Sequence, residues 1–65
     1  MTFGRKMLEF RAKHNLTQKQ LANIIGADIN TVYRTENEKT DPTKRNEIIY
    51  EKKMKEWEEK QNVSL

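Results

Sequence analysis

Residues 20–37 read QLANIIGADINTVYRTEN, an amphipathic pattern interrupted by Gly26 and Asp28. Glycine takes the left-handed conformation that ends a helix without steric penalty. Asp28 is a good N-cap for a following helix, and its carboxylate favours the positive end of the helix dipole. The stretch therefore predicts two short helices joined by a tight turn, with Val32 and Thr35 of the second helix facing the core.

The start of the first of these two helices is marked by local capping signals. Thr17 followed three residues later by Gln20 matches a capping box, in which each side chain bonds the other residue's backbone N–H. Leu16 and Leu21 stand at the positions of a hydrophobic staple. The helix is expected to start at Thr17, and it buries the apolar residues Leu21, Ala22 and Ile25.

Upstream of this pair, one further helix is expected. Phe3, Met7, Phe10 and His14 recur with helical spacing and predict the apolar stripe of a helix that ends near Asn15.

Downstream, NEKTDPT is polar and contains the single proline, so it is a loop. Asp41 with Pro42, or else Thr43, is expected to cap the last helix. From Lys44 to about Gln61 the sequence lacks Gly and Pro and predicts one long helix.

These elements predict an all-α, single-domain fold of three helices plus one long C-terminal helix. We expect residues 1–43 to form a helix-turn-helix head. Residues 44–65 are expected to complete its core and to provide a dimer contact. Ile48, Ile49 and Tyr50 are expected to fold back on the body. The spacing of Tyr50, Met54 and Trp57 resembles a short coiled-coil seam, and we expect these three residues to join two chains in a homodimer.

The composition excludes several classes of protein. The 65 residues contain no cysteine, one histidine and no glycine-rich phosphate loop, so neither an enzyme, a metal site, a cofactor nor a small-molecule ligand is expected. No apolar run is long enough for a membrane span, and the absence of cysteine fits the reducing cytoplasm. Residues 1–45 hold nine Lys/Arg against five Asp/Glu, whereas residues 46–65 hold four against five. The positive field therefore belongs to the head, as in a polyanion-binding protein.

From about Arg11 to Thr43 the sequence resembles the phage-repressor type of helix-turn-helix domain, the Xre-like and Cro-like DNA-binding family. The family's recurring unit corresponds here to residues 18–37. It has a small residue where the two helices touch, a turn glycine, core aliphatic residues and an acidic residue near its end: Ala22, Gly26, Leu21, Ile25, Val32 and Glu36.

The resemblance implies a regulator, of the kind found in phages and mobile elements, that reads the major groove of double-stranded DNA with residues 28–37. It further implies a Cro-like repressor acting as a homodimer on a palindromic operator. Arg11 and Glu36 occupy the places of a structural ion pair. The DNA contacts implied are Gln18, Ile29, Asn30, Thr31, Tyr33, Arg34, Asn37, Lys39 and Lys44.

The sequence departs from the family at three points. Thr35 stands where the family prefers a bulkier apolar residue, which predicts a thinner core. Glu38 replaces the glycine that usually ends the recognition helix, so that helix is expected to run longer or at a different angle. One long charged helix also replaces the two short apolar helices with which the family normally finishes.

An alternative function also fits the sequence. The chain could be a protein-interaction module of the antitoxin or anti-repressor type, which binds its partner through the C-terminal helix and uses the helix-turn-helix as a scaffold. In that case Tyr33 and Arg34 are ordinary exposed side chains.

Overall fold

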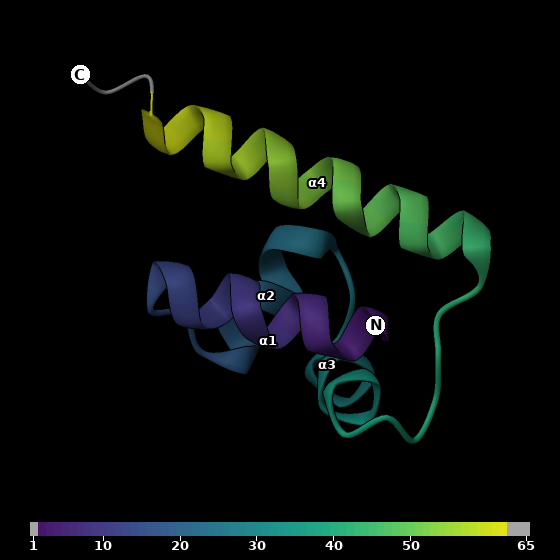
Figure 1. The fold of residues 1–65 in the computed structure, drawn as a ribbon. Coiled ribbons are helices and arrows are strands. Elements are labelled where there is room, and N and C mark those ends of the chain that lie inside the picture. The colour runs from purple at the N-terminus through teal and green to yellow at the C-terminus, as the bar shows by residue number, and fades with distance from the viewer. Residues whose placement is uncertain (1, 63–65) are drawn as a thin grey trace.

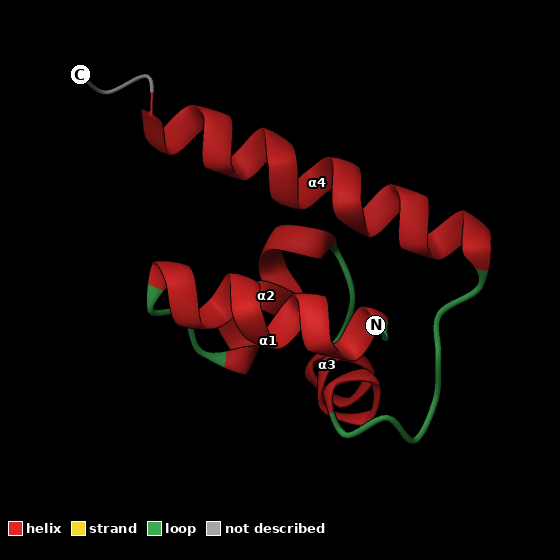
Figure 2. Cartoon of the chain, viewed as in Figure 1, coloured by secondary structure: helices red, strands yellow, loops and turns green. Residues whose placement is uncertain are grey.

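The computed structural model describes residues 2–62, which form helices and loops and contain no strand (Figure 2). The all-α class agrees with the sequence prediction, as does the division into three short helices and one long one. In Figure 1, α1 and α2 lie between α3 at the bottom and α4 at the top. The helices are α1 (Phe3–His14), α2 (Gln18–Ile25), α3 (Ile29–Glu36) and α4 (Lys44–Asn62).

The start of α2 and the turn between α2 and α3 have the predicted construction. The Thr17 hydroxyl accepts from the Gln20 N–H at 3.1 Å, and the Gln20 side chain accepts from the Thr17 N–H at 2.8 Å. Gly26 ends α2 with a φ of 75°. Asp28 then caps α3, accepting from the Thr31 N–H at 2.8 Å, and this bond lowers the pKa of its carboxyl. The chain therefore stops one helix and starts the next within a few residues.

The C-terminal end of α3 differs from the prediction. The helix ends at Glu36, and Glu38 takes the left-handed conformation, with a φ of 60°, that the missing glycine would have taken. The Lys39 N–H donates to the Arg34 carbonyl at 2.9 Å, and the Glu38 N–H donates to the Thr35 carbonyl at 3.1 Å. These two bonds form a Schellman motif. The expected longer helix is therefore wrong, because the capping bonds hold a non-glycine residue in the strained conformation.

Gly4 and Thr35 bring α1 and α3 into close contact. A Cβ atom added to Gly4 would overlap the backbone carbonyl oxygen of Thr35. Thr35 itself is buried, with 2% of its surface exposed. Since one helix presents glycine where it crosses the backbone of the other, there is no room at this crossing for a bulkier contact. The backbone of Thr35 therefore lies at the crossing of α1 and α3.

The hydrophobic core joins residues from all four helices. Met54 of α4 is 7% exposed and packs in the same cluster as the buried residues of α1, α2 and α3. The cluster comprises Phe3, Met7, Leu21, Ala22, Ile25, Val32 and Met54. Thr43 rather than Asp41 caps α4, since its hydroxyl accepts from the Asn46 N–H at 3.2 Å. The C-terminal helix thus contributes to the core of the head, but through Met54 and not through the isoleucines expected there.

Aromatic side chains separate α4 from α1, and the two helices run in the same direction (Figure 1). Tyr50 lies 6.0 Å from Phe3 between ring centroids, and Trp57 lies 5.8 Å from Phe10. Ring pairs at these distances are favourable contacts. An ion pair and a hydrogen bond flank them, with Lys6 2.8 Å from Glu51 and the His14 Nε2 2.7 Å from a carboxylate oxygen of Glu58.

Two of the residues expected in this contact lie elsewhere. Ile48 is 61% exposed and Ile49 is 38% exposed, so neither folds back on the body as predicted. Tyr50 does so in part. The reason is helical phase: the face that carries Tyr50, Met54 and Trp57 is turned to the body, Ile48 lies on the opposite side of the helix, and Ile49 lies at the border between the two. Within residues 2–62, no helix is both long and apolar enough to cross a membrane.

Candidate nucleic-acid interface

The outer face of α3 is an exposed surface of mixed chemistry. Val32, Thr35 and Glu36 are its buried residues. The side chains between them are turned to solvent, as the 3.6-residue helical repeat requires. Ile29 is 46% and Tyr33 is 49% exposed, and the polar residues of this face are exposed as well. The predicted base-contacting residues Ile29, Asn30, Tyr33 and Arg34 therefore share one accessible helix face.

The residues after α3 extend this face. The Asn37 side-chain amide donates to the Tyr33 carbonyl at 2.8 Å, so it takes part in ending the helix. The left-handed turn at Glu38 brings Lys39 back toward the helix, with its ammonium 6.0 Å from the centre of the Tyr33 ring. A cation at this distance from an aromatic face is attracted to it weakly. Lys39 therefore places a positive charge beside the exposed face of α3.

The outer face is held in position by the predicted ion pair. The Arg11 Nε and Nη2 atoms donate to the two carboxylate oxygens of Glu36 at 2.7 and 2.8 Å, and Nη1 donates to the Leu16 carbonyl at 3.2 Å. The Glu36 side chain is 2% exposed. Hydrogen bonding to Glu36 raises the pKa of Arg11 above its ordinary value. A bidentate pair at a nearly dry site fixes the angle between α1 and α3.

Gln18 adds α2 to this pair. Its side-chain Nε2 donates to Glu36 Oε1 at 3.0 Å, so one carboxylate receives hydrogen bonds from α1 and from α2. A role for Gln18 as a brace was not expected from the sequence in this form. The amide nitrogen carries two hydrogens, and the second one can still donate to a phosphate. We call Arg11, Gln18 and Glu36 the three-helix clamp.

Two other residues of the predicted contact set lie outside the exposed face. Thr31 is half-buried, and its backbone N–H is taken by the Asp28 cap. Lys44 begins α4, at the opposite end of the loop that rises from α3 (Figure 1). The structure therefore does not bring Lys44 together with the other predicted contacts. The loop after residue 37 leads away from α3, a course that the sequence pattern did not reveal.

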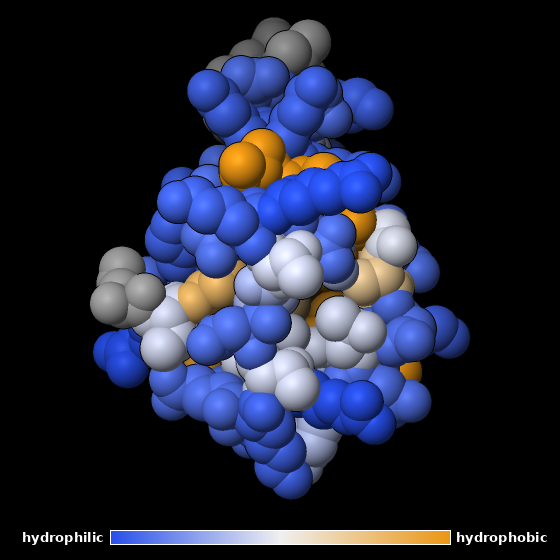
Figure 3. Space-filling model, turned by 90° about the vertical axis from the view of Figure 1, so that its right-hand side faces the viewer, coloured by the Kyte–Doolittle hydropathy of each residue, from blue (hydrophilic) through white to orange (hydrophobic). Residues whose placement is uncertain are grey.

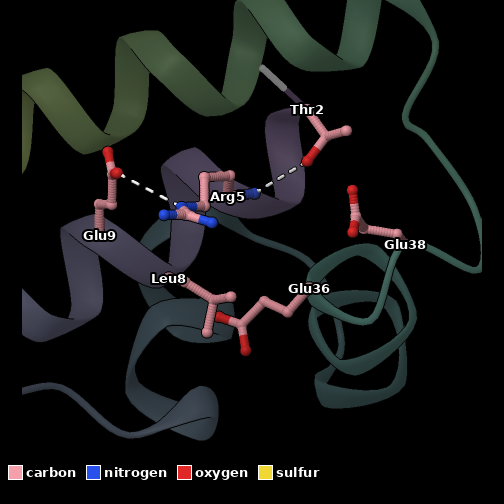
Figure 4. Close-up of a pocket in the computed structure, with 6 residues that line it drawn as sticks. All are labelled: Thr2, Arg5, Leu8, Glu9, Glu36 and Glu38. Atoms are coloured by element: carbon pink, nitrogen blue, oxygen red, sulfur yellow. Dashed lines mark hydrogen bonds and ion pairs between the residues drawn. The ribbon is translucent and has the colours of Figure 1, made fainter.

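A cleft of about 470 Å³ lies beside the clamp, between α1 and the end of α3 (Figure 4). Three of the residues that line it are carboxylates, and its one guanidinium, on Arg5, is paired with Glu9 at 3.5 Å. The negative charge makes this cleft unfavourable for phosphate groups. Within residues 2–62, no three His, Cys, Asp or Glu side chains gather as a metal site would require. The lining residues are Thr2, Arg5, Leu8, Glu9, Glu36 and Glu38.

The residues predicted to join two chains are engaged within one chain. Met54 is buried in the core. Trp57 packs its ring against Phe10 and against His14, the latter at 5.0 Å between ring centres. Tyr50 packs on Phe3. Met54 is therefore not available for the predicted dimer contact, whereas Tyr50 and Trp57 are covered only in part by the body of the same chain. The homodimer as such stays a prediction.

Comparisons with known proteins add no relative to this description. No family model matches the chain, and neither the search of curated proteins nor that of solved structures found a significant match.

Proposed function

We propose that the protein is a sequence-specific double-stranded DNA-binding regulator that inserts α3 into the major groove. The observation that carries this proposal is the exposed outer face of α3, which projects Asn30, Tyr33 and Arg34 from a helix braced by the three-helix clamp. An α-helix fits the major groove, where each base pair displays a distinct pattern of donors and acceptors. A braced helix contributes affinity, because little conformational freedom is lost on binding.

The chemistry of this face suits direct readout of bases. Arg34 has the fork of donors that matches O6 and N7 of guanine, and Asn30 has the donor and acceptor that match N6 and N7 of adenine. Ile29 suits contact with a thymine methyl group. Lys39 and Asn37 follow the helix and suit the phosphate backbone, as does the second amide hydrogen of Gln18. In this assignment the side chains of α3 determine which DNA sequence is bound, and the phosphate contacts of Gln18, Asn37 and Lys39 add affinity for any sequence.

The mechanism proposed is occlusion of an operator, which needs no catalytic step. A homodimer on a palindromic site, with half-sites about 34 Å apart, is the arrangement that the resemblance to Cro-like repressors suggests. Since the body of the same chain buries Met54 and partly covers Tyr50 and Trp57, this dimer needs a different contact surface or forms on the DNA itself.

Selection from a pool of random duplexes, followed by titration of the selected duplex at two salt concentrations, tests the proposal. We expect affinity to fall steeply with salt, since Lys and Arg displace counterions from the phosphates. Arg34→Ala should weaken the selected site by about 1–3 kcal/mol and flatten preference at one base position. Arg5→Ala is the matched control, because Arg5 lies on α1 and pairs with Glu9.

Two results would count against this function. A chain that binds no duplex at low salt is not a DNA-binding protein. If Arg34→Ala weakens binding to selected and to random DNA equally, Arg34 does not read a base. If Arg34→Ala and Arg5→Ala weaken binding equally, the affinity depends on the net charge of the protein and not on the position of Arg34. A palindromic selected sequence would support the homodimer at the same time.

A further inference from the structure

The first turns of α4 present a second exposed face, which the proposed function does not use. Arg45, Ile48, Ile49 and Lys52 follow the spacing i, i+3, i+4, i+7, so they lie along one side of the helix. All four are exposed, and Ile48, at 61%, is the more exposed of the two isoleucines. Figure 3 shows apolar surface on this upper part of the molecule, bordered by hydrophilic residues. We call these four residues the α4 outer face.

Charge is separated across α4 in this region. Glu51 pairs with Lys6 of α1 at 2.8 Å, and Glu47 is half-buried. Arg45 and Lys52 point outward and form no ion pair within residues 2–62. One acidic group of these turns, Glu51, is therefore paired with α1, whereas the α4 outer face is positive with an apolar centre.

The core does not explain the two isoleucines, since neither packs against the hydrophobic cluster, although more than half of the Ile49 surface is covered. An isoleucine at an exposed helix position is a poorer helix former than lysine, glutamate or leucine, and Ile48, which is 61% exposed, gains little from burial. Two adjacent isoleucines between two cations instead match the pattern of a helix that packs against another helix through apolar residues and flanking charges.

We propose that the α4 outer face binds an acidic amphipathic helix of a second protein. The isoleucines would pack against its apolar residues, and Arg45 and Lys52 would lie opposite its carboxylates. Nucleic acid fits less well, since a phosphate backbone offers no apolar partner for Ile48 and Ile49.

A second copy of the chain also fits less well, by an argument that rests on the proposed function. Helices α4 and α3 lie on opposite sides of the molecule, with α1 and α2 between them (Figure 1). Two copies joined through α4 would direct their α3 helices away from each other, so both could not enter one straight duplex. The same opposition leaves the α4 outer face accessible while α3 is bound to DNA.

The test uses two synthetic helical peptides of about 16 residues, long enough to form helix on a surface. Both carry leucines with i, i+3, i+4, i+7 spacing; one is flanked by glutamates and its twin by lysines. We expect the glutamate peptide to bind the full chain at least about tenfold more tightly than the lysine twin, a difference of about 1.4 kcal/mol. Amide shifts measured by NMR should concentrate at Arg45, Ile48, Ile49 and Lys52.

Variants locate the binding. The double substitution Ile48→Ser and Ile49→Ser should abolish tight binding, and Lys52→Glu should reverse the preference between the two peptides. Leu8→Ser is the matched control, because Leu8 is 39% exposed but lies on α1. Lys60→Glu makes the same charge change farther along α4. Since all these side chains are exposed, thermal unfolding should stay near that of the parent chain and exclude misfolding as a cause.

Four results would overturn the proposal: equal affinity for the two peptides, no binding of either, binding unaffected by the serine substitutions, or shifts centred on α3. Binding to anionic phospholipid vesicles that needs Ile48, without binding of the glutamate peptide, would assign the face to lipid. Concentration-dependent sedimentation that Ile48→Ser abolishes would assign it to a second copy. No DNA is present in these titrations, so their outcome is independent of the duplex experiment.

Discussion

Single residues decide where the helices of this protein end. Gly26, Asn15 and Glu38 all have positive φ and each follows a short helix. The turn at Gly26 can be predicted from the sequence, since glycine is the residue that takes this conformation freely. Asn15 takes it at modest cost. Glu38 gives no such signal, and its conformation follows from the capping hydrogen bonds of Lys39 and of Glu38 itself.

Replacing Glu38 with glycine should stabilise the fold. A left-handed non-glycine residue costs about 1–2 kcal/mol, part of which is offset because glycine is more flexible in the unfolded chain. We expect Glu38→Gly to raise the free energy of unfolding by about 0.5–1 kcal/mol in urea denaturation. Asn37→Gly is the control: its φ is −86° and its side chain bonds the Tyr33 carbonyl, so that change should destabilise. The same sign for both variants would disprove the strain at Glu38.

Gly4 shows what a residue-by-residue interpretation of the sequence misses. It lies inside a helix, where glycine is unfavourable, and no motif marks it. Its purpose becomes visible once α3 is in place, because a side chain there would meet the Thr35 carbonyl. The pattern of apolar residues predicts which face of α1 is buried, but it does not tell how closely another backbone approaches.

At the scale of elements, the helices and their caps were largely predictable. The capping box at Thr17 and the cap at Asp28 are local devices, so the bounds of α2 and α3 follow from short stretches of sequence. The pairing of Arg11 with Glu36 was expected from the resemblance, and the structure contains it. The added bond from Gln18 was not, since it depends on where three helices meet.

The three-helix clamp should show strong coupling between α1 and α3. Removing one partner leaves the other buried and unpaired, so Arg11→Met and Glu36→Leu should each cost about 3 kcal/mol, whereas the double variant should lose much less than their sum. We expect a coupling energy of about 1.5–3 kcal/mol. Thermal unfolding of the four proteins of the cycle measures it, in a buffer that contains sucrose so that the single variants stay folded at low temperature.

Arg5 and Glu9 provide the comparison cycle for the clamp. They form an exposed i,i+4 pair, with side chains 68% and 59% exposed, and their coupling should stay below about 0.5 kcal/mol. Additive losses at Arg11 and Glu36 would mean that the clamp does not hold α1 and α3 as a unit.

The contact of α4 with the end of α1 should depend on acid. Hydrogen bonds from His14, and next from Lys13, lower the pKa of Glu58 below its ordinary 4.5. A lowered folded-state pKa contributes stability above the unfolded value, and this stability is lost as pH falls through the folded one.

Glu58→Gln should therefore lower the free energy of unfolding at pH 6 by about 0.5–1 kcal/mol and make little difference at the lowest pH. Thermal unfolding between pH 2 and 7 measures this. Glu59→Gln, at an exposed neighbouring position, should leave the acid limb unchanged. An identical acid limb in the Glu58→Gln variant would place the acid sensitivity elsewhere, for example at the Asp28 cap.

At the scale of the molecule, the placement of α4 is the part that the sequence could not decide. The recurrence of Tyr50, Met54 and Trp57 tells which side of the helix is apolar. It does not tell whether the same chain or a second one covers that side. The structure turns this face to the body and leaves Ile48 and Ile49 outside, the reverse of the expectation for the isoleucines.

Because α4 contributes Met54 to the core, we expect the head to unfold when the packing of α4 against it is lost. Met54→Ala should cost about 2–4 kcal/mol, most of the stability that a chain of this size has. We expect one cooperative loss of all helices in circular dichroism, with Ile48→Ala, at an exposed site, as the control. A variant in which α4 is lost while residues 1–43 stay helical would instead make the head an independent unit.

The parallel pairing of the first helix with the last also bears on how the protein matures. Phe3 finds its ring partner in Tyr50, and Phe10 finds its own in Trp57, so contacts at the front of the chain await residues that are synthesised late. The native ring contacts of α1 thus cannot form before Tyr50 and Trp57 are translated. Until then, the faces of Phe3 and Phe10 that α4 covers are open to chaperones.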